Sequence, residues 1–560
     1  MELATIYIAI LRIAAPVLAA LILFQCIRPL LTFRREPEIW ARLHLPDGST
    51  LPVTHWENVI GRRRDCDIVI DCETVSKNHA VLTRYDDGSW TIRDAGSQNG
   101  IRVNYEKVQI SALLDGDTIN IGGVDMWLEP ATPQQIRRIS EMRTKTSGFV
   151  SVANLLLLTL FQMLCALGYL LNSSGDHADG ILMGFGGLIA LEWLLLIFYG
   201  IIRRSAFEVE TLAFFLCTLG MCVICATAPG EAFKQLAATV LGLVMFLIVG
   251  WSLRDLERAK KIRYIAAVAG LGLLVITLLF AEEIHGARNW LYIGGISIQP
   301  SELSKLCFVF VGASAMDRIM EKRNLILFIV YSAILCGLLA LMNDFGTALI
   351  FFIAFLSIAY MRSGSIGTIG LALTSVGFAG VLVLKIAPHA LRRFATWGHV
   401  WEDPLGKGYQ QVKSLQCVAS GGLFGLGAGN GWMKNLFASD SDVVFATVSE
   451  EWGILMAIMM VVCVAALALF CLRSAGAGRS SFYTIGACTA ASIILAQAIL
   501  NTMGTLDLLP FTGVTFPFVS NGGSSMLASW GLLGFVKAAD TRQNASFAIR
   551  LNRNREVRDR

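Results

Sequence analysis

Polar and charged side chains stand at the ends of long apolar segments at two places in this sequence. One is the stretch Gln-Pro-Ser-Glu-Leu-Ser-Lys at residues 299–305, and the other is Ser441-Asp442. Placing such groups at the end of a membrane helix costs free energy, so they more often belong to a functional site than occur by chance. A carboxylate at Asp442 could take up a proton, and a cation such as Lys305 could hold an anionic group.

The composition predicts that this site belongs to a membrane protein. The 560 residues are 55% hydrophobic and only 16% charged, whereas a soluble domain carries about 25% charged residues. The formal net charge of +4 gives no indication of nucleic-acid binding, and none is expected. The 13 cysteines lie mostly inside apolar runs, without the spacing of a zinc site or a disulfide framework.

Apolar runs of spanning length predict about thirteen transmembrane helices. They are expected at roughly 4–27, 149–172, 181–202, 207–228, 233–253, 262–280, 302–316, 324–342, 346–361, 366–387, 443–472, 481–503 and 519–538. The loops on one side are all basic, as is the tail after 540, which favours the cytoplasm for that side. The long outer loop at 388–442 is then extracytoplasmic, together with Asp442.

Residues 40–130 differ from the rest because short alternating strands replace the apolar runs. Turn signals such as Asp115-Gly116 separate them, which predicts a small cytoplasmic all-β sandwich. The predicted division is therefore a first helix at 1–30, the β domain at 31–130, a linker at 131–147, two extra helices at 148–206, a ten-helix core at 207–540 and a basic tail at 541–560.

The β segment resembles the forkhead-associated (FHA) family. The resemblance rests on Gly61-Arg62, Ser-Lys-Asn-His at 76–79, Asp-Ala-Gly-Ser-Gln-Asn-Gly at 94–100 and Asn104. It implies a domain that binds phosphothreonine through loops at one end of a sandwich.

By position in these motifs, the resemblance implies that Arg62 and Ser76 hold the phosphate while Lys77 and Ser97 assist. Asn99 would hydrogen-bond the peptide backbone, and His79 would brace the binding loop. A guanidinium and short hydroxyl donors suit a doubly charged phosphate. The alternative is a retained scaffold with an inactive pocket.

The membrane part resembles the shape, elongation, division and sporulation (SEDS) family, to which RodA and FtsW belong. Its motifs follow one another over about 207–540, at 286–290, 299–305, 344–347, 408–410, 420–422, 450–453, 512–514 and 517–525. The resemblance implies a peptidoglycan glycosyltransferase that polymerises lipid II at the outer face of the bacterial cytoplasmic membrane.

The resemblance also places the catalytic aspartate at Asp442. Two positions depart from the pattern: Val443 stands where an aromatic residue is common, and Asn289 stands where many members have arginine. Glycosyl transfer needs a base for the acceptor hydroxyl and positive charge for the leaving pyrophosphate. Lys305, Arg393 and a divalent cation such as Mg²⁺ or Mn²⁺ are candidates for that charge.

The remaining candidates for substrate binding come from the same motifs. They are Gln299, Ser301, Glu302, Arg288, Tyr409, Gln410 and Ser420. The glycine-rich stretch 421–431 is expected to let the backbone approach a bulky glycan.

Structural interpretations stay open for several of these residues. Glu302 and Lys305 could form only an ion pair, the glutamates at 450–451 could serve packing, and Asp344 or Asp442 could simply cap a helix.

Three functions compete at this stage. The first is the polymerase, with a class B penicillin-binding transpeptidase as partner and a phosphothreonine protein or Ser/Thr kinase substrate on the FHA domain. The second is a flippase for the lipid-linked precursor, and the third is a non-catalytic scaffold for a transpeptidase. The sequence does not separate roles in division, elongation and sporulation.

Overall fold

A computed structural model describes most of the chain. It covers residues 2–32, 38–64, 66–85, 88–135, 148–172, 177–254, 256–283, 286–294, 296–315, 322–363, 388–475 and 480–542, with isolated residues at 138, between 366 and 380, and at 478, 545 and 546.

The described membrane part is a bundle of helices. They are α1 (Glu2–Thr32), α3 (Gly148–Asn172), α4 (Ala178–Ile201), α5 (Glu208–Thr227), α6 (Ala232–Ser252), α7 (Leu256–Phe280), α8 (Pro300–Ala315), α9 (Lys322–Leu341), α10 (Phe345–Ser363), α12 (Pro388–Thr396), α13 (Tyr409–Gly421), α14 (Val444–Trp452), α15 (Ile454–Ala475), α16 (Ser481–Thr505) and α17 (Gly523–Ala538). Among the described residues, nine helices are long and apolar enough to cross a membrane. The chain is therefore a multi-pass membrane protein, as predicted.

One predicted span is wrong. The apolar run at 443–472 is two helices, α14 and α15, because Gly453 between them adopts a φ of +87° that ends the first helix. The predicted span at 366–387 lies largely outside the described residues.

The β domain is a sandwich of two sheets, which confirms the predicted class. One sheet has the order β2 (Thr50–Val53), β1 (Ala41–His44), β11 (Val124–Pro130), β10 (Thr118–Ile121), β7 (Ile101–Val103), β8 (Glu106–Val108). The other has the order β4 (Ile68–Val69), β3 (Glu57–Gly61), β5 (Ala80–Arg84), β6 (Trp90–Asp94), β9 (Ile110–Leu113). Alternating buried residues such as Leu82 and Ile92, which lie opposite each other, fill the space between the sheets.

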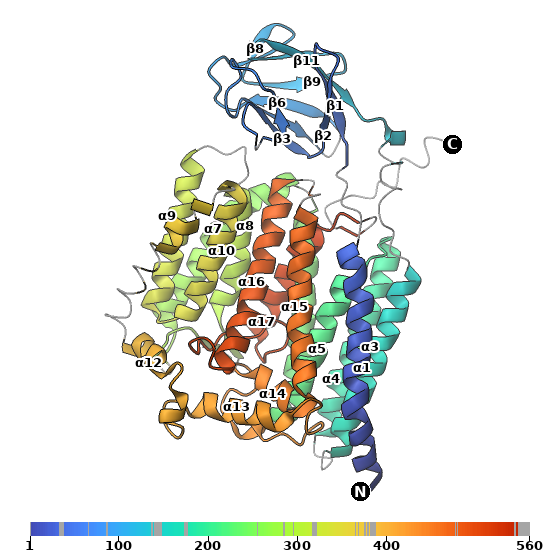
Figure 1. The fold of residues 1–560 in the computed structure, drawn as a ribbon, viewed down its shortest axis with the longest axis vertical. Helices are drawn as coiled ribbons and strands as arrows, with labels where there is room; N and C mark the ends of the chain where they lie inside the picture. Colours follow the sequence, from blue (N-terminus) through green and yellow to red (C-terminus); the bar gives the residue numbers. More distant parts are fainter. Residues whose placement is uncertain are drawn as a thin grey trace.

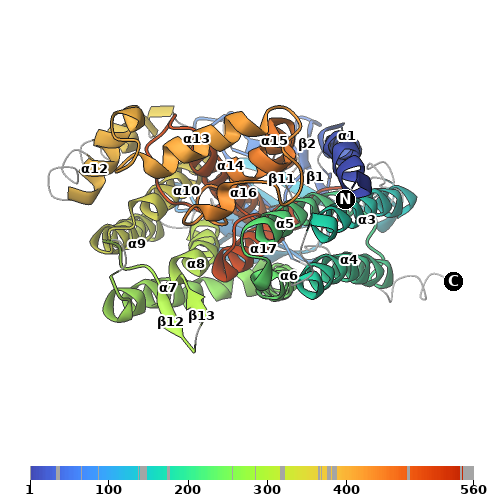
Figure 2. The same cartoon turned by 90° about the horizontal axis from the view of Figure 1, so that it is seen from below.

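The β domain and the predicted catalytic loop lie at opposite ends of the bundle. Figure 1 shows the sandwich at one end and α12, α13 and α14 at the other. Figure 2 shows this second end, where α13 and α14 run across the bundle and the hairpin β12 (Leu291–Ile293)–β13 (Ile296–Ile298) projects. Helices α1, α3 and α4 form a group on one side of the bundle.

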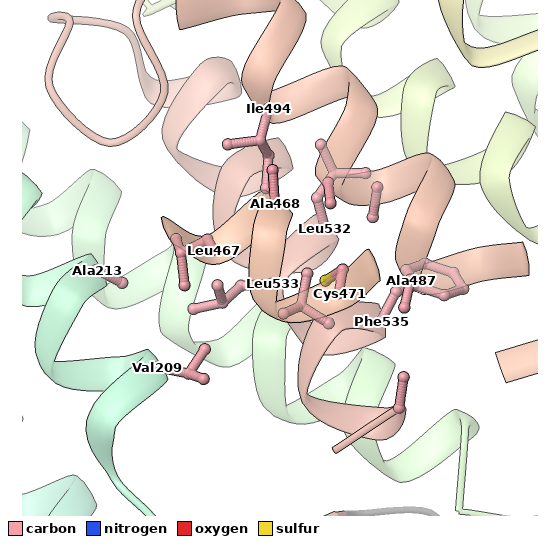
Figure 3. Close-up of a cluster of buried hydrophobic side chains, with 14 of the residues drawn as sticks. Val209, Ala213, Leu467, Ala468, Cys471, Ala487, Ile494, Leu532, Leu533 and Phe535 are labelled. Carbon is pink, nitrogen blue, oxygen red and sulfur yellow. The ribbon is translucent and has the colours of Figure 1, made fainter. Parts of the chain in front are cut away.

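The centre of the bundle is α5, whose apolar stretch is entirely buried. Helices α1, α3, α4, α6, α14 and α15 pack against it. Small and branched side chains such as Ala213, Leu467 and Leu533 fill the core that α5 shares with α15, α16 and α17 (Figure 3). Trp530 of α17 is fully buried and makes edge contacts with Phe214 and Phe246. These contacts hold α17, which has only 16 residues, inside the bundle.

A buried charged cluster fastens the end of α17 and the residues that follow it to α5. Lys537 Nζ lies 3.0 Å from Glu210, and Arg542 pairs with Glu208 at 2.9 Å and with Asp540 at 2.7 Å. These side chains are almost completely excluded from solvent. Each charge has an opposite partner, which is the condition for burying charges at acceptable cost.

The β domain contacts the bundle at the start of α16. Ser480, which caps α16, donates from its hydroxyl to Glu57 Oε2 at 3.4 Å, and the Trp56 ring stands edge-on to Tyr483 at 6.0 Å. Glu57 and Trp56 are buried in this contact. The sandwich is thus seated directly on a helix of the core.

Candidate functional site

Asp442 lies in the loop just before α14, and its backbone is fixed from two sides. Its N–H donates to the Ala438 carbonyl at 3.0 Å. Asn501 of α16 donates from its amide to the carbonyls of Asp442 and Val514, each at 2.9 Å. One amide therefore joins the Asp442 loop to the segment that precedes α17.

The Asp442 carboxyl group does not cap a helix. The residue at the cap of α14 is Val443, and no side chain caps that helix. Burial raises the pKa of Asp442 from 3.8 to about 6, and the charge of Asp440 adds to the rise, while Ser441 and Arg393 oppose it. The carboxyl group is half-buried, so it can still meet a ligand.

Gly513 lies against this carboxyl group. It has a φ of +66°, and a Cβ placed on it would stand 3.2 Å from Asp442 Oδ2. Glycine thus allows both the turn and the close approach of the backbone to the carboxylate.

A second polar cluster holds the neighbouring residues. Asn521 donates from its amide to Asp440 Oδ2 at 2.7 Å and to Glu231 Oε2 at 2.9 Å. Ser520 donates to the Ser441 carbonyl at 2.6 Å and accepts from Phe516 N–H. The loop that carries Asp442 is therefore fastened to the 516–521 turn on several sides.

The predicted substrate-binding residues at 299–305 do not form one site. Lys305 Nζ lies 2.7 Å from Glu302 Oε1 inside α8, and the two side chains are 1% and 5% exposed. The Ser301 hydroxyl is buried and makes no hydrogen bond among the described residues. This geometry is that of a buried ion pair, the structural alternative that the sequence left open.

Gln299 belongs instead to a polar group around Asp344. The Gln299 and Asn289 amides each donate to Asp344 Oδ2 at 3.4 Å. Asp344 also caps α10, since its Oδ1 accepts from Thr347 N–H at 3.1 Å. Arg288 is exposed and pairs with Glu283 at 3.3 Å.

The remaining predicted substrate-binding residues lie on the outer loop elements. Arg393 of α12 is exposed and donates to the Thr512 carbonyl at 3.3 Å, next to Gly513. Tyr409 is exposed at the start of α13, and Gln410 donates to the Phe437 carbonyl at 3.1 Å. The Ser420 hydroxyl bonds to the Cys417 carbonyl of its own helix. Arg393 is thus the predicted cation whose charge acts on Asp442.

The glutamates at 450–451 serve the loop packing. Glu450 Oε2 accepts from Met433 N–H at 2.9 Å. Glu451 Oε1 accepts from Gly431 N–H at 3.4 Å.

The glycines at 421–431 fit against these residues. A Cβ on Gly421 or Gly425 would stand 2.0 or 2.1 Å from a backbone oxygen of α14. The close approach that these glycines allow is to α14, rather than to a glycan as the sequence predicted.

The predicted phosphopeptide residues gather at one end of the sandwich. Ser76 Oγ accepts from Gln98 N–H at 3.1 Å, Ser97 Oγ accepts from Gly100 N–H at 2.9 Å, and the Asn99 amide donates to the Thr74 carbonyl at 2.8 Å. Arg62 and Lys77 are exposed beside them, and Arg62 N–H donates to the Ser76 carbonyl at 3.1 Å.

His79 is fully buried beneath these loops. Its Nδ1 accepts from Ser76 N–H at 3.0 Å, and Nε2 lies 3.0 Å from the Gly100 carbonyl. The neutral ring with the proton on Nε2 satisfies both contacts. His79 therefore connects the loop that carries Ser76 to the loop that carries Asn99.

Sequence reasoning missed several residues that shape the site. Asn501, Asn521, Asp440 and Gly513 all contact the Asp442 loop or its neighbour. Two signals were available. Gly513 and Asn521 lie in the family motifs at 512–514 and 517–525, and Asn501 is an amide inside the apolar segment of α16, a position that polar side chains occupy only with a partner. In the part of the chain that the structure describes, no three carboxylate, histidine or cysteine residues are grouped for a metal ion.

The fold and this site define a polytopic membrane protein with a cluster of polar loop residues around Asp442 at one end and a phosphopeptide-type β-sandwich at the other. The chain belongs to the cell cycle protein family of FtsW, RodA and SpoVE, whose model matches residues 216–545. The FHA domain model matches residues 58–122.

Relatives of known name agree with this membership. The chain is 31% identical over 327 residues to the peptidoglycan glycosyltransferase RodA of Mycobacterium tuberculosis (strain ATCC 25618 / H37Rv), covering 55% of this chain and 69% of the relative. It is 34% identical over 307 residues to the probable peptidoglycan glycosyltransferase FtsW of Moranella endobia, covering 53% and 79%. A chain in a structure of a peptidoglycan synthase complex that coordinates polymerization and crosslinking has 25% identity and a TM-score of 0.51, covering 59% of this chain and 96% of that chain.

Proposed function

We propose that this protein is a peptidoglycan glycosyltransferase that polymerises lipid II, with Asp442 as the general base. The observation that supports this most is the Asp442 carboxyl group, which caps no helix and whose pKa burial raises to about 6. A base works best when its pKa is near the working pH. The named relatives carry the same activity in their names.

In this proposal the Asp442 carboxylate removes the proton from the acceptor sugar hydroxyl as the new glycosidic bond forms. The leaving pyrophosphate needs positive charge, and exposed Arg393 supplies it beside the same loop. Lys305 is a weaker candidate, because Glu302 already neutralises it inside α8.

The proposed orientation places the β domain and the C-terminal tail in the cytoplasm of a bacterium. Asp442 then faces the outside, since α13 and α14 lie at the opposite end of the bundle (Figure 1). Basic loops on the side of the β domain support this orientation. A class B penicillin-binding transpeptidase is the proposed membrane partner, because the similar synthase complex combines polymerization with crosslinking.

The FHA domain is proposed to bind a phosphothreonine in a cytoplasmic protein. Arg62, Ser76 and Asn99 lie on joined loops at one end of the sandwich, where a guanidinium and hydroxyl groups can meet a phosphate. Kinase signalling would then reach the membrane enzyme through this domain.

The test is polymerisation of purified lipid II by the full-length protein, with glycan chains separated on a gel. Asp442→Asn is expected to lower the rate by about 100-fold or more, the usual effect of losing a positioned base. Glu402→Gln, an exposed carboxylate of the same outer loop, is the matched control and is expected to leave the rate unchanged. An Asp442→Asn protein with a normal rate would refute the assignment. A wild-type protein that moves lipid II across vesicles without polymerising it would favour the flippase.

A further inference from the structure

Helix α3 precedes the part of the chain that the family model matches, yet it reaches into the support of α14. Tyr169 in its last turns is 3% exposed and donates from its hydroxyl to Glu451 Oε2 at 2.7 Å. Trp452 Nε1 donates to the same hydroxyl at 3.2 Å. One hydroxyl thus satisfies two consecutive side chains at the end of α14.

The same face of α3 also holds the glycine-rich loop. Asn172 lies three residues after Tyr169, on the same side of the helix. Its amide donates to the Ala428 carbonyl at 2.9 Å and to Asn430 Oδ1 at 3.0 Å. Because Glu451 also accepts from Gly431 N–H, Tyr169, Glu451 and the loop form one connected network.

Helix α14 connects this network to Asp442. It has nine residues and begins two residues after Asp442. A helix of nine residues is about 14 Å long, so only about two turns separate Glu451 from the first turn of α14. The end held by Tyr169 is therefore opposite the end that follows the carboxylate.

We propose that Tyr169 is a positioning residue for Asp442, so that the helices added before the family core complete the support of the catalytic loop. This inference rests on the proposed function, because it assumes that Asp442 does the chemistry. Removing the Tyr169 hydroxyl leaves Glu451 Oε2 and Trp452 Nε1 buried without this partner, and α14 must shift to satisfy them.

The experiment compares Tyr169→Phe with Tyr7→Phe in the full-length enzyme. Tyr7 of α1 also uses its hydroxyl in a contact between helices that precede the family core. It donates to the Leu164 carbonyl of α3 at 2.8 Å, and this hydrogen bond does not involve α14. Tyr169→Phe is expected to lower kcat about 10-fold with little change in KM, since small misplacements of a catalytic group cost rate rather than binding. Tyr7→Phe is expected to keep the wild-type kcat.

A double-variant cycle shows whether Tyr169 acts through Glu451. In the Glu451→Ala background, Tyr169→Phe is expected to cause a smaller further loss than in the wild type, because the Glu451 contact is already gone and only the Trp452 contact remains. Independent losses that multiply would overturn the inference, as would a wild-type kcat for Tyr169→Phe. A fall in the amount of folded protein with an unchanged kcat would show a structural role only and overturn it too.

The outcomes separate this inference from the proposed function. If Asp442→Asn polymerises lipid II at the wild-type rate, the proposed function fails whatever Tyr169 does. If Asp442→Asn is inactive and Tyr169→Phe is normal, the proposed function stands and only the role of Tyr169 is refuted.

Discussion

At the scale of residues, the surroundings of the proposed catalytic carboxylate determine its position and its pKa. Asp442 lies in the loop before α14, its N–H donates to the Ala438 carbonyl, and burial raises its pKa. The sequence predicted Asp442 through a family motif. It did not predict that Asn501 and Gly513 contact Asp442, because these residues lie 59 and 71 positions further along the chain and only the fold brings them together.

The rate of polymerisation is expected to depend on the ionisation of Asp442. The base must be ionised, so the rate should fall as the pH drops through about 6. A pH–rate profile of the full-length enzyme checks this. A profile without an acidic limb between about pH 5 and 7 would contradict the role of Asp442.

The contribution of Asp442 to the free energy of unfolding should change with pH in the opposite direction, falling as the pH rises. The pKa of Asp442 in the folded protein lies above its ordinary value of 3.8, so the folded state binds the proton more tightly. Protonated Asp442 therefore contributes stability that is fully present below pH 3.8 and is lost as the pH rises through about 6. Asp442→Asn should therefore melt at a higher temperature than wild type at about pH 7.5, and the difference should shrink at about pH 4.5.

The buried ion pair in α8 gives a third prediction at this scale. Lys305→Met leaves the Glu302 carboxylate buried without its cation, which should lower the free energy of unfolding by about 3–5 kcal/mol. The double variant Glu302→Gln with Lys305→Met removes both charges and should recover most of the loss. Thermal unfolding in detergent compares the three proteins, and a double variant as unstable as the single one would show that the charges do more than pair.

At the scale of elements, the contact between α14 and the glycine-rich loop is the least predictable feature. The apolar run at 443–472 has the composition of one span, and only the φ of Gly453 divides it. The backbone of the glycine-rich loop touches the backbone of α14 at Gly421 and Gly425. Such a backbone contact leaves no periodic pattern in the sequence.

This contact predicts a large difference between two glycine variants. Gly425→Ala forces a φ of +79° and a Cβ 2.1 Å from the Glu451 carbonyl oxygen. It should destabilise the protein by about 3 kcal/mol or more, since backbone strain and overpacking add. Gly422→Ala has a φ of +56° with open space around it, so it should cost only the strain, about 1–2 kcal/mol. Equal melting temperatures for the two variants would contradict the close packing.

At the scale of the whole molecule, the sequence predicted both the membrane bundle and the β-sandwich. Long apolar runs mark the bundle, whereas short alternating strands mark the β domain, so the two parts are easily told apart. It did not predict that the sandwich rests on α16 through Glu57 and Trp56, since those residues read as ordinary strand positions. This seat joins the FHA domain directly to a helix that also holds the Asp442 backbone through Asn501.

Binding at the FHA domain is expected to need both the phosphate and Arg62. Arg62→Ala should weaken the binding of a phosphothreonine peptide by about 1.5–3 kcal/mol, the value of a hydrogen bond to a charged group. Arg102→Ala, an exposed arginine of β7, is the charge-matched control and should bind as wild type. Calorimetry on the full-length protein, with the unphosphorylated peptide in parallel, makes the comparison. Equal affinity for both peptides would show an inactive pocket.

The charged cluster at the end of α17 also has a consequence for synthesis. Glu210 must wait for Lys537, which is 327 residues later, and Glu208 must wait for Arg542, which is 334 residues later. Until Lys537 and Arg542 leave the ribosome, the central helix α5 carries two carboxylates without these cations. Truncated chains that end before Lys537 should therefore be recognised as incompletely assembled and degraded.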